Sequence, residues 1–160
     1  LWTSSYLIRA HGISTELAAA FASLFFIGIT AGRFLTGFIA NRLGDKKLIR
    51  IGASGMVLGI FLIALPFELS ALAGFIVFGL GCAPVYPSII HSTPFNFGAE
   101  NSQAIIGIQM ASAYVGSTFM PPVFGLIANH ADIRLLPLFL IFFTALLVIM
   151  SEKLNKTVCK

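Results

Sequence analysis

The chain has 160 residues, of which 58% are hydrophobic and only 10% are charged, and its net charge is +4. A soluble domain carries roughly 25% charged residues, so this composition excludes an ordinary soluble domain and predicts an integral membrane protein. The basic residues stand between apolar segments and form no continuous basic surface, which argues against a nucleic-acid partner. The two cysteines predict neither a disulfide framework nor a metal site.

Apolar segments follow one another along the whole chain. Residues 1–9 read as the end of a helix that is only partly present. Five further segments each approach the ~20 residues that cross a bilayer as a helix, and a backbone in lipid must satisfy its own hydrogen bonds. These five predicted spans are 15–40, 48–65, 70–91, 103–128 and 133–150. The expected fold class is therefore all-α and integral to a membrane.

Glycine, serine and proline mark the ends of the first two spans. We expect Gly12 to end the first helix and Ser14 to cap the next one. Gly44 should turn the chain before the second span, and Pro66 should end that span. Pairs of glycines four residues apart, at 28/32 and 55/59, predict close approach between helices.

Prolines divide the remaining chain. Pro84 and Pro87 should interrupt the third span and free backbone carbonyls that line a cavity or find partners. Pro94 and Gly98 predict the longest loop, at residues 93–100. A short polar turn is expected at residues 129–132.

The basic residues are distributed unevenly about the predicted spans. Arg9 and Arg134 fall on one side, and the other eight fall on the opposite side, which by the positive-inside rule is cytoplasmic. We therefore expect a multi-pass protein of the plasma membrane whose 37–47 turn and C-terminus are cytoplasmic. The eight residues are Arg33, Arg42, Lys46, Lys47, Arg50, Lys153, Lys156 and Lys160.

The turn itself, GFIANRLGDKK at 37–47, has a distinctive spacing of glycine and charge. It resembles the cytoplasmic loop signature of the major facilitator superfamily, in which the first glycine permits close helix contact and the second a tight turn. In that family an acid caps a neighbouring helix and the cations latch a gate, but here Asn41 stands where the family has Asp. The resemblance implies a gating loop formed by Arg33, Gly37, Asn41, Arg42, Gly44, Lys46 and Lys47.

That resemblance also implies how the chain is organised. Residues 1–9 would be the end of the seventh helix of a twelve-helix transporter, and the five spans would be helices eight to twelve. The chain is then a six-helix C-terminal half whose partner is the missing N-terminal half. The segments GLGCAPVYPSIIHSTP, IGIQMASAYVGSTFMPP and WTSSY are similar to those of fucose-permease-like sugar transporters within the superfamily.

Polar and aromatic residues inside the spans are the candidate substrate-binding residues, because such groups are costly in lipid. Trp2 and Tyr6 share a helix face and could stack on a sugar ring, and an interfacial aromatic belt is the alternative for both. On other spans Gln109 offers two donors and an acceptor to a hydroxyl-rich ligand. The remaining candidates are Ser23, Thr30, Tyr86 and Ser112, and hydrogen bonds between helices are the alternative for each.

Residues on the other face of the fourth span, Tyr114, Ser117 and Thr118, are expected to bond to neighbouring helices. All six acidic residues are predicted to lie at span ends or in loops. The expected coupling ion, a proton or a sodium ion, therefore has no carboxylate at mid-membrane in this chain, and we expect any coupling proton to be carried by the N-terminal half.

The function that follows from the resemblance is secondary active transport of a small polar solute, with a sugar as the expected class, by alternating access. Efflux of another small organic solute and a non-transporting membrane sensor remain as alternatives. An intramembrane enzyme is not expected, because His11, His91 and His130 have no spacing suited to a metal and no nucleophile motif occurs. No cofactor is expected.

Overall fold

The computed structural model describes residues 2–130 and 132–158, and these residues form helices joined by short links with no strand among them. Leu1, at the start of the predicted partial helix, and Lys160, one of the eight basic residues, lie outside this description. The helices are α1 (Trp2–His11), α2 (Thr15–Leu43), α3 (Asp45–Ala64), α4 (Glu68–Phe97), α5 (Ala99–His130) and α6 (Leu136–Val158), with a short 3₁₀ turn, η1 (Ile133–Leu135). Apart from α1, each helix is long and apolar enough to span a membrane, with η1 continuing into α6 in the last span. An all-α membrane fold is confirmed.

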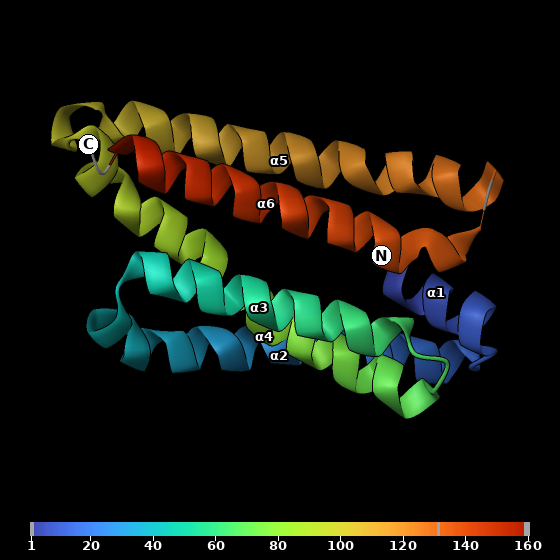
Figure 1. Cartoon of the computed structure of the whole chain (residues 1–160). Helices are drawn as coiled ribbons and strands as arrows, with labels where there is room; N and C mark the ends of the chain where they lie inside the picture. Colours follow the sequence, from blue (N-terminus) through green and yellow to red (C-terminus); the bar gives the residue numbers. More distant parts are fainter. Residues whose placement is uncertain (1, 131, 159–160) are drawn as a thin grey trace.

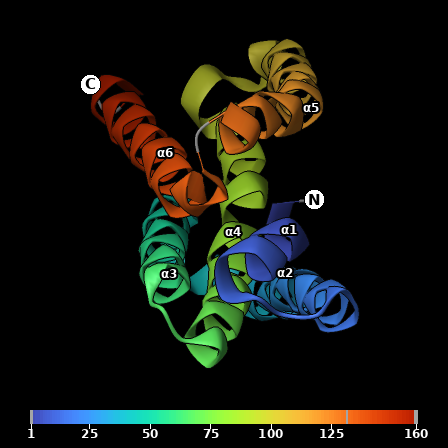
Figure 2. The ribbon, with the colours of Figure 1, turned by 90° about the vertical axis from the view of Figure 1, so that its right-hand side faces the viewer.

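Helix α4 holds the bundle together. It packs along both α2 and α3 over most of their lengths, and its C-terminal part reaches α5 (Figures 1 and 2). The short helix α1 packs on α2, and α6 packs mainly on α3. Only 11% of an apolar 18-residue stretch of α5 is buried in the bundle. This helix therefore offers a large face to lipid or to another part of the protein.

Glycines allow the three central helices to touch backbone to backbone. A Cβ added at Gly28 of α2 would lie 2.5 Å from the carbonyl oxygen of Ile76 in α4. A Cβ added at Gly59 of α3 would lie 2.6 Å from the amide nitrogen of Phe78, also in α4. The glycine pairs at 28/32 and 55/59 therefore bring both helices against α4, and the prediction of close helix approach is confirmed.

The predicted helix ends around the first spans are also confirmed. Gly12 follows the last residue of α1 with a φ of 69°. The side chain of Ser14 accepts a hydrogen bond from the Leu17 amide at 3.4 Å and caps α2. Gly44, with a φ of 74°, is the single residue between α2 and α3, and α3 ends two residues before Pro66.

The predicted interruption of the third span and the loop at 93–100 are both wrong. Helix α4 runs without a break through Pro84, Pro87 and Pro94, and only Gly98, with a φ of 83°, separates it from α5. A proline removes one helical hydrogen bond, whereas a loop inside an apolar layer leaves several backbone groups unsatisfied. The spans consequently extend beyond the predicted 70–91 and 103–128.

The ends of the helices fall into two groups at opposite ends of the bundle (Figure 1). The turn at Gly44, the link at Gly98 and the end of α6 lie at one end, and the links at Gly12 and Pro66 lie at the other. We refer to the first group as the basic end, because Arg42, Lys46 and Lys156 belong to it. This is the arrangement that five consecutive passes through a membrane produce.

Candidate functional site

A pocket of about 530 Å³ and one of about 620 Å³ lie near the basic end. The larger one opens between α2 and α4. It is lined by Arg33 and Gly37 of α2, by Gly44 of the turn, and by Pro87 and His91 of α4. Three of the residues predicted for the gating loop therefore meet around one space.

Three other residues of the predicted gating loop, Arg42, Lys46 and Lys47, are not among the residues that line this pocket. Arg42, Lys46 and Lys47 are exposed. The side chain of Asn41 lies outside the described part of the structure. Gly37 does not permit a close contact with a helix of this chain, because a Cβ added there would meet nothing within 4 Å. Nine residues separate it from Gly28, so at about 100° per residue it faces away from the packed side of α2.

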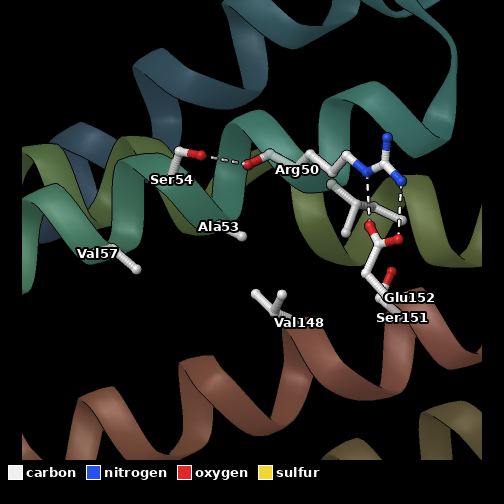
Figure 3. A pocket seen from close by; sticks show the side chains of 8 residues that line it. Arg50, Ala53, Ser54, Val57, Val148, Ser151 and Glu152 are labelled. Carbon is white, nitrogen blue, oxygen red and sulfur yellow. Dashed lines mark hydrogen bonds and ion pairs between the residues drawn. The ribbon is translucent and has the colours of Figure 1, made fainter.

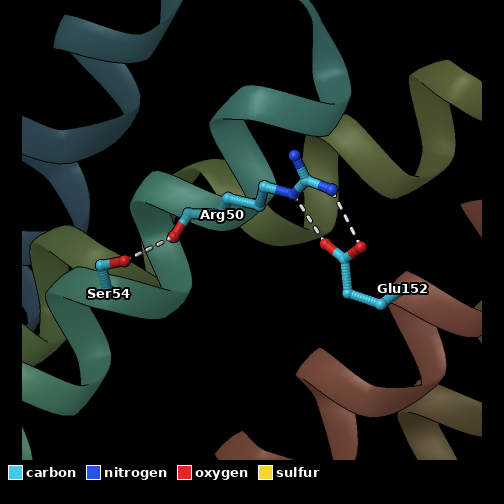
Figure 4. A network of polar contacts seen from close by, with 3 residues as sticks. All are labelled: Arg50, Ser54 and Glu152. Atoms are coloured by element: carbon cyan, nitrogen blue, oxygen red, sulfur yellow. Dashed lines mark hydrogen bonds and ion pairs between the residues drawn. The ribbon is translucent and has the colours of Figure 1, made fainter.

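Two side-chain contacts at the basic end, one between Asp45 and His91 and one ion pair between Arg50 and Glu152, were not predicted from the sequence. Asp45, the first residue of α3, lies 2.8 Å from Nδ1 of His91 in α4. Arg50 of α3 donates from Nε and Nη2 to the two carboxylate oxygens of Glu152 in α6, at 2.6 and 2.8 Å, beside the smaller pocket (Figures 3 and 4). Asp45 stands in the first turn of α3, where an acid is favourable, and this position can be recognised from the sequence. Its contact with His91 and the pairing of Arg50 with Glu152 join residues far apart in the chain, so no local spacing indicates them.

Trp2 and Tyr6 both pack inside the bundle. The indole nitrogen of Trp2 donates to the carbonyl oxygen of Pro121 in α5 at 3.0 Å, and its ring meets Phe124 edge to face. The Tyr6 hydroxyl donates to the carbonyl oxygen of Ile63 in α3 at 3.2 Å, and the residue is 5% exposed. In this conformation Tyr6 is not open to a ligand.

The hydroxyls predicted on α2 are satisfied within their own helix. Ser23 donates to the carbonyl oxygen of Ala20 and Thr30 to that of Phe26. Both residues are exposed, but these bonds satisfy their donors even against lipid. Neither side chain therefore requires a polar neighbour.

The candidate residues on α4 and α5 are not satisfied within their own helices, in contrast to those on α2. Gln109 is half-buried and exchanges hydrogen bonds with the Thr93 hydroxyl at 3.2 Å, which is the inter-helix alternative considered for it. Tyr86 is 41% exposed, and Ser112 is exposed. Tyr114 is 74% exposed and contacts no other helix by a hydrogen bond within the described residues, so its expected bond to a neighbouring helix stays a prediction. This exposure arises because α5 touches the bundle along only part of its length.

The predicted substrate-binding residues do not gather in one pocket of this chain. Trp2 lines a pocket of about 370 Å³ with rings from α2, α4, α5 and α6, among them Phe25, Phe78 and Phe139. Gln109 lines a separate pocket of about 480 Å³ nearer the basic end. Whether these residues bind a substrate stays a prediction.

The acidic residues are accounted for by helix ends and by pairing. Glu16, Asp45, Glu68 and Glu100 each stand in the first turn of a helix, where a negative charge is favourable. Asp132 caps η1, and Glu152 pairs with Arg50. The predicted absence of a mid-span carboxylate is therefore confirmed for all six acids. Within residues 2–130 and 132–158, no three His, Cys, Asp or Glu side chains are placed to hold a metal ion.

Comparison with known proteins assigns the chain to a family. A family model described as the Major Facilitator Superfamily matches residues 1–154. The membrane protein MosC of Rhizobium meliloti is 28% identical over 144 residues, which are 88% of this chain and 34% of that protein. An uncharacterised MFS-type transporter of Yersinia pestis is 28% identical over 139 residues, which are 82% of this chain and 34% of that protein.

An uncharacterised transporter of Sinorhizobium fredii, y4wD, is 28% identical over 156 residues, covering 97% of this chain and 41% of that protein. The chain thus spans less than half the length of each of these relatives. No solved structure matches the chain significantly. With a family match over nearly its whole length and five helices fit to span a bilayer, the chain belongs to the major facilitator superfamily of membrane transporters.

Proposed function

We propose that the chain forms the C-terminal half of a twelve-helix secondary transporter that moves a small polar solute by alternating access. The observation that carries this proposal is a set of unsatisfied hydroxyls near the middle of α4 and α5. Tyr86 and Ser112 are exposed, and within the described residues their side-chain hydroxyls have no hydrogen-bond partner. In lipid such groups are costly, so they favour a polar cavity completed by another part of the protein.

A sugar is the solute class that we propose. The support is the similarity of three segments of the chain to fucose-permease-like transporters, together with the chemistry of the exposed groups. Hydroxyls such as those of Tyr86 and Ser112 both donate and accept hydrogen bonds, as sugars require. The aromatic pocket around Trp2 offers ring faces on which a sugar could stack.

The orientation that we propose places the basic end in the cytoplasm, where the excess of Lys and Arg is expected. Alternating access would then open and close this end by movement of the two halves about the central cavity. Since all six acids lie at helix ends, we propose that a coupling proton binds in the N-terminal half.

Counterflow of radiolabelled sugar into vesicles that contain the full-length protein tests the proposal. We expect exchange with at least one hexose, deoxyhexose or amino sugar, and Tyr86→Phe should weaken the apparent affinity for that sugar about tenfold, the typical value of one hydrogen bond to a ligand. Ser23→Ala is the matched control, because the Ser23 hydroxyl already bonds to its own helix. Sugar binding without exchange would identify a sensor instead, and folded protein that neither binds nor exchanges any of these sugars would exclude the sugar assignment.

Replacement of Lys46 and Lys47 by alanine should shift the protein towards its inward-open state. Both cations are exposed at the basic end, and their removal weakens the contacts expected to close that end. We expect a cysteine introduced at Ser112 to react about two- to fivefold faster with a reagent added from the cytoplasmic side, as loss of surface ion pairs would allow. The double variant Lys153→Ala/Lys156→Ala removes equal charge from the same end and should leave this reaction rate unchanged. If both double variants change the rate by the same factor, Lys46 and Lys47 are not gate residues.

A further inference from the structure

We propose that the aromatic pocket around Trp2 binds an apolar substituent of the transported solute, so that aryl and longer alkyl glycosides are preferred over free sugars. The inference rests on the proposed transport of a sugar-like solute and narrows the class of substrate.

The walls of this pocket are almost entirely apolar. Its volume is about 370 Å³, and α1, α2, α4, α5 and α6 all contribute side chains to it. An apolar cavity of about 150 Å³ is already large enough to bind benzene, so a substituted phenyl ring has room here. The aromatic side chains of the lining are Trp2, Phe25, Phe75, Phe78, Phe124 and Phe139.

The few polar groups of the lining are mostly engaged already. The indole nitrogen of Trp2 donates to the carbonyl oxygen of Pro121 at 3.0 Å, and the Ser117 hydroxyl donates to that of Tyr114 at 3.0 Å. Thr3 remains, and its hydroxyl has no hydrogen-bond partner within the described residues. A free sugar carries hydroxyls around its whole ring, and burial in this pocket would leave most of them unpaired. An aryl or alkyl group has no such cost and gains from its burial.

The pocket opens towards α5, beside a polar group of the proposed cavity. Its floor is buried, since Phe75 is 3% and Phe124 is 1% exposed, whereas Met120 of α5 is 38% exposed. Gly116, which also lines the pocket, stands four residues after Ser112 and therefore on the same face of α5. About 6 Å along the helix axis separates the two residues. A sugar bound at Ser112 can thus place its substituent in the pocket.

The same juxtaposition favours an amphipathic solute over a lipid acyl chain. Gly116 stands 17 residues after Ala99 and 14 residues before His130, so at least roughly 20 Å of α5 separates it from either end of the helix. At this depth the Ser112 hydroxyl has no partner within the described residues. A purely apolar occupant would leave that hydroxyl unpaired, whereas a glycoside satisfies it with its sugar and fills the pocket with its substituent.

Competition in the counterflow assay tests the inference. Vesicles that contain the full-length protein exchange the radiolabelled sugar that supports counterflow, in the presence of the methyl or the phenyl glycoside of the same sugar. We expect the phenyl glycoside to inhibit the exchange at about ten- to hundredfold lower concentration than the methyl glycoside. This range corresponds to burial of the additional apolar surface of the ring.

Two glycines of α5 provide matched variants. A Cβ added at Gly116 or at Gly107 would meet nothing within 4 Å, so leucine at either position is compatible with the fold. Gly116→Leu occupies the pocket and should remove the advantage of the phenyl glycoside, while the methyl glycoside inhibits as before. Gly107→Leu lies outside the pocket and should keep the advantage. Ser117→Phe, at an exposed lining position, is a second way to fill the pocket and should act as Gly116→Leu does.

The failure of this inference differs from the failure of the proposed function. Equal inhibition by the two glycosides in the wild type overturns the inference and leaves sugar transport standing. A phenyl advantage that survives both Gly116→Leu and Ser117→Phe also overturns it, because the ring would then bind elsewhere, and so does an advantage that is lost equally in Gly107→Leu. Absence of counterflow with every sugar contradicts the proposed function itself, and the inference falls with it.

Discussion

Gly81→Ala is expected to lower the free energy of unfolding by about 3 kcal/mol, the upper range for overpacking a close-packed interior. Gly81 lies at the crossing of α3 and α4, and an added Cβ would come within 2.5 Å of the Met56 amide nitrogen and 2.7 Å of the Gly52 carbonyl oxygen. These are backbone atoms, so no side-chain rotation relieves the clash and the two helices must separate. Thermal unfolding of the purified full-length protein in detergent measures the loss.

Gly107→Ala is the matched control for this substitution. Gly107 also lies inside a helix, but a Cβ added there would meet nothing within 4 Å. Alanine is favoured over glycine in a helix by roughly 0.5–1 kcal/mol, so this variant should be neutral or slightly more stable. The two substitutions are chemically identical, and equal unfolding temperatures would show that α3 and α4 do not pack through Gly81.

Gly44→Val is expected to cost about 2 kcal/mol and to abolish transport. Gly44 alone joins α2 to α3, with φ 74° and ψ 157°, a conformation that is essentially restricted to glycine. Valine would have to leave this conformation, which would displace the start of α3 together with Asp45 and its contact with His91. Unfolding temperature and counterflow activity of the full-length protein provide the two measurements.

The link at Gly98 supplies an internal comparison. Its φ of 83° and ψ of 151° are close to those of Gly44, and it likewise stands alone between two long helices. Gly98→Val should therefore reduce stability by a similar amount, whereas Gly107→Val, in open space on α5, should not. A stable Gly44→Val protein with normal counterflow would mean that the turn tolerates a second backbone conformation.

Sequence reasoning was most successful where a property depends on neighbours in the chain. The length of an apolar segment decides whether it can cross a bilayer, so the five spans were predicted, with errors mainly at their ends. The turn at Gly44 and the cap at Ser14 follow from the conformational preferences of single residues. The predicted interruption of the third span at the prolines of α4 was wrong, because the hydrogen bond that a proline removes costs less than a break in the helix within lipid.

The residues of one helix do not by themselves reveal which other helices their side chains contact. Tyr114 and Gln109 are both polar residues of α5, yet the first is 74% exposed and the second bonds to Thr93 of α4. The difference arises because Gln109 lies against α4, whereas the described helices leave Tyr114 uncovered. For this reason the face of α5 that meets a cavity could not be predicted from helical periodicity alone.

The amino-acid sequence by itself determined that this protein is helical, crosses a membrane five times after a short first helix, and carries its acids at the ends of its spans. Only the tertiary structure decided that α4 is the central helix and that Asp45 meets His91 and Arg50 meets Glu152. The physical reason is distance along the chain: partition into lipid acts on each segment separately, whereas Arg50 and Glu152 stand 102 residues apart and meet only after α3 and α6 have packed.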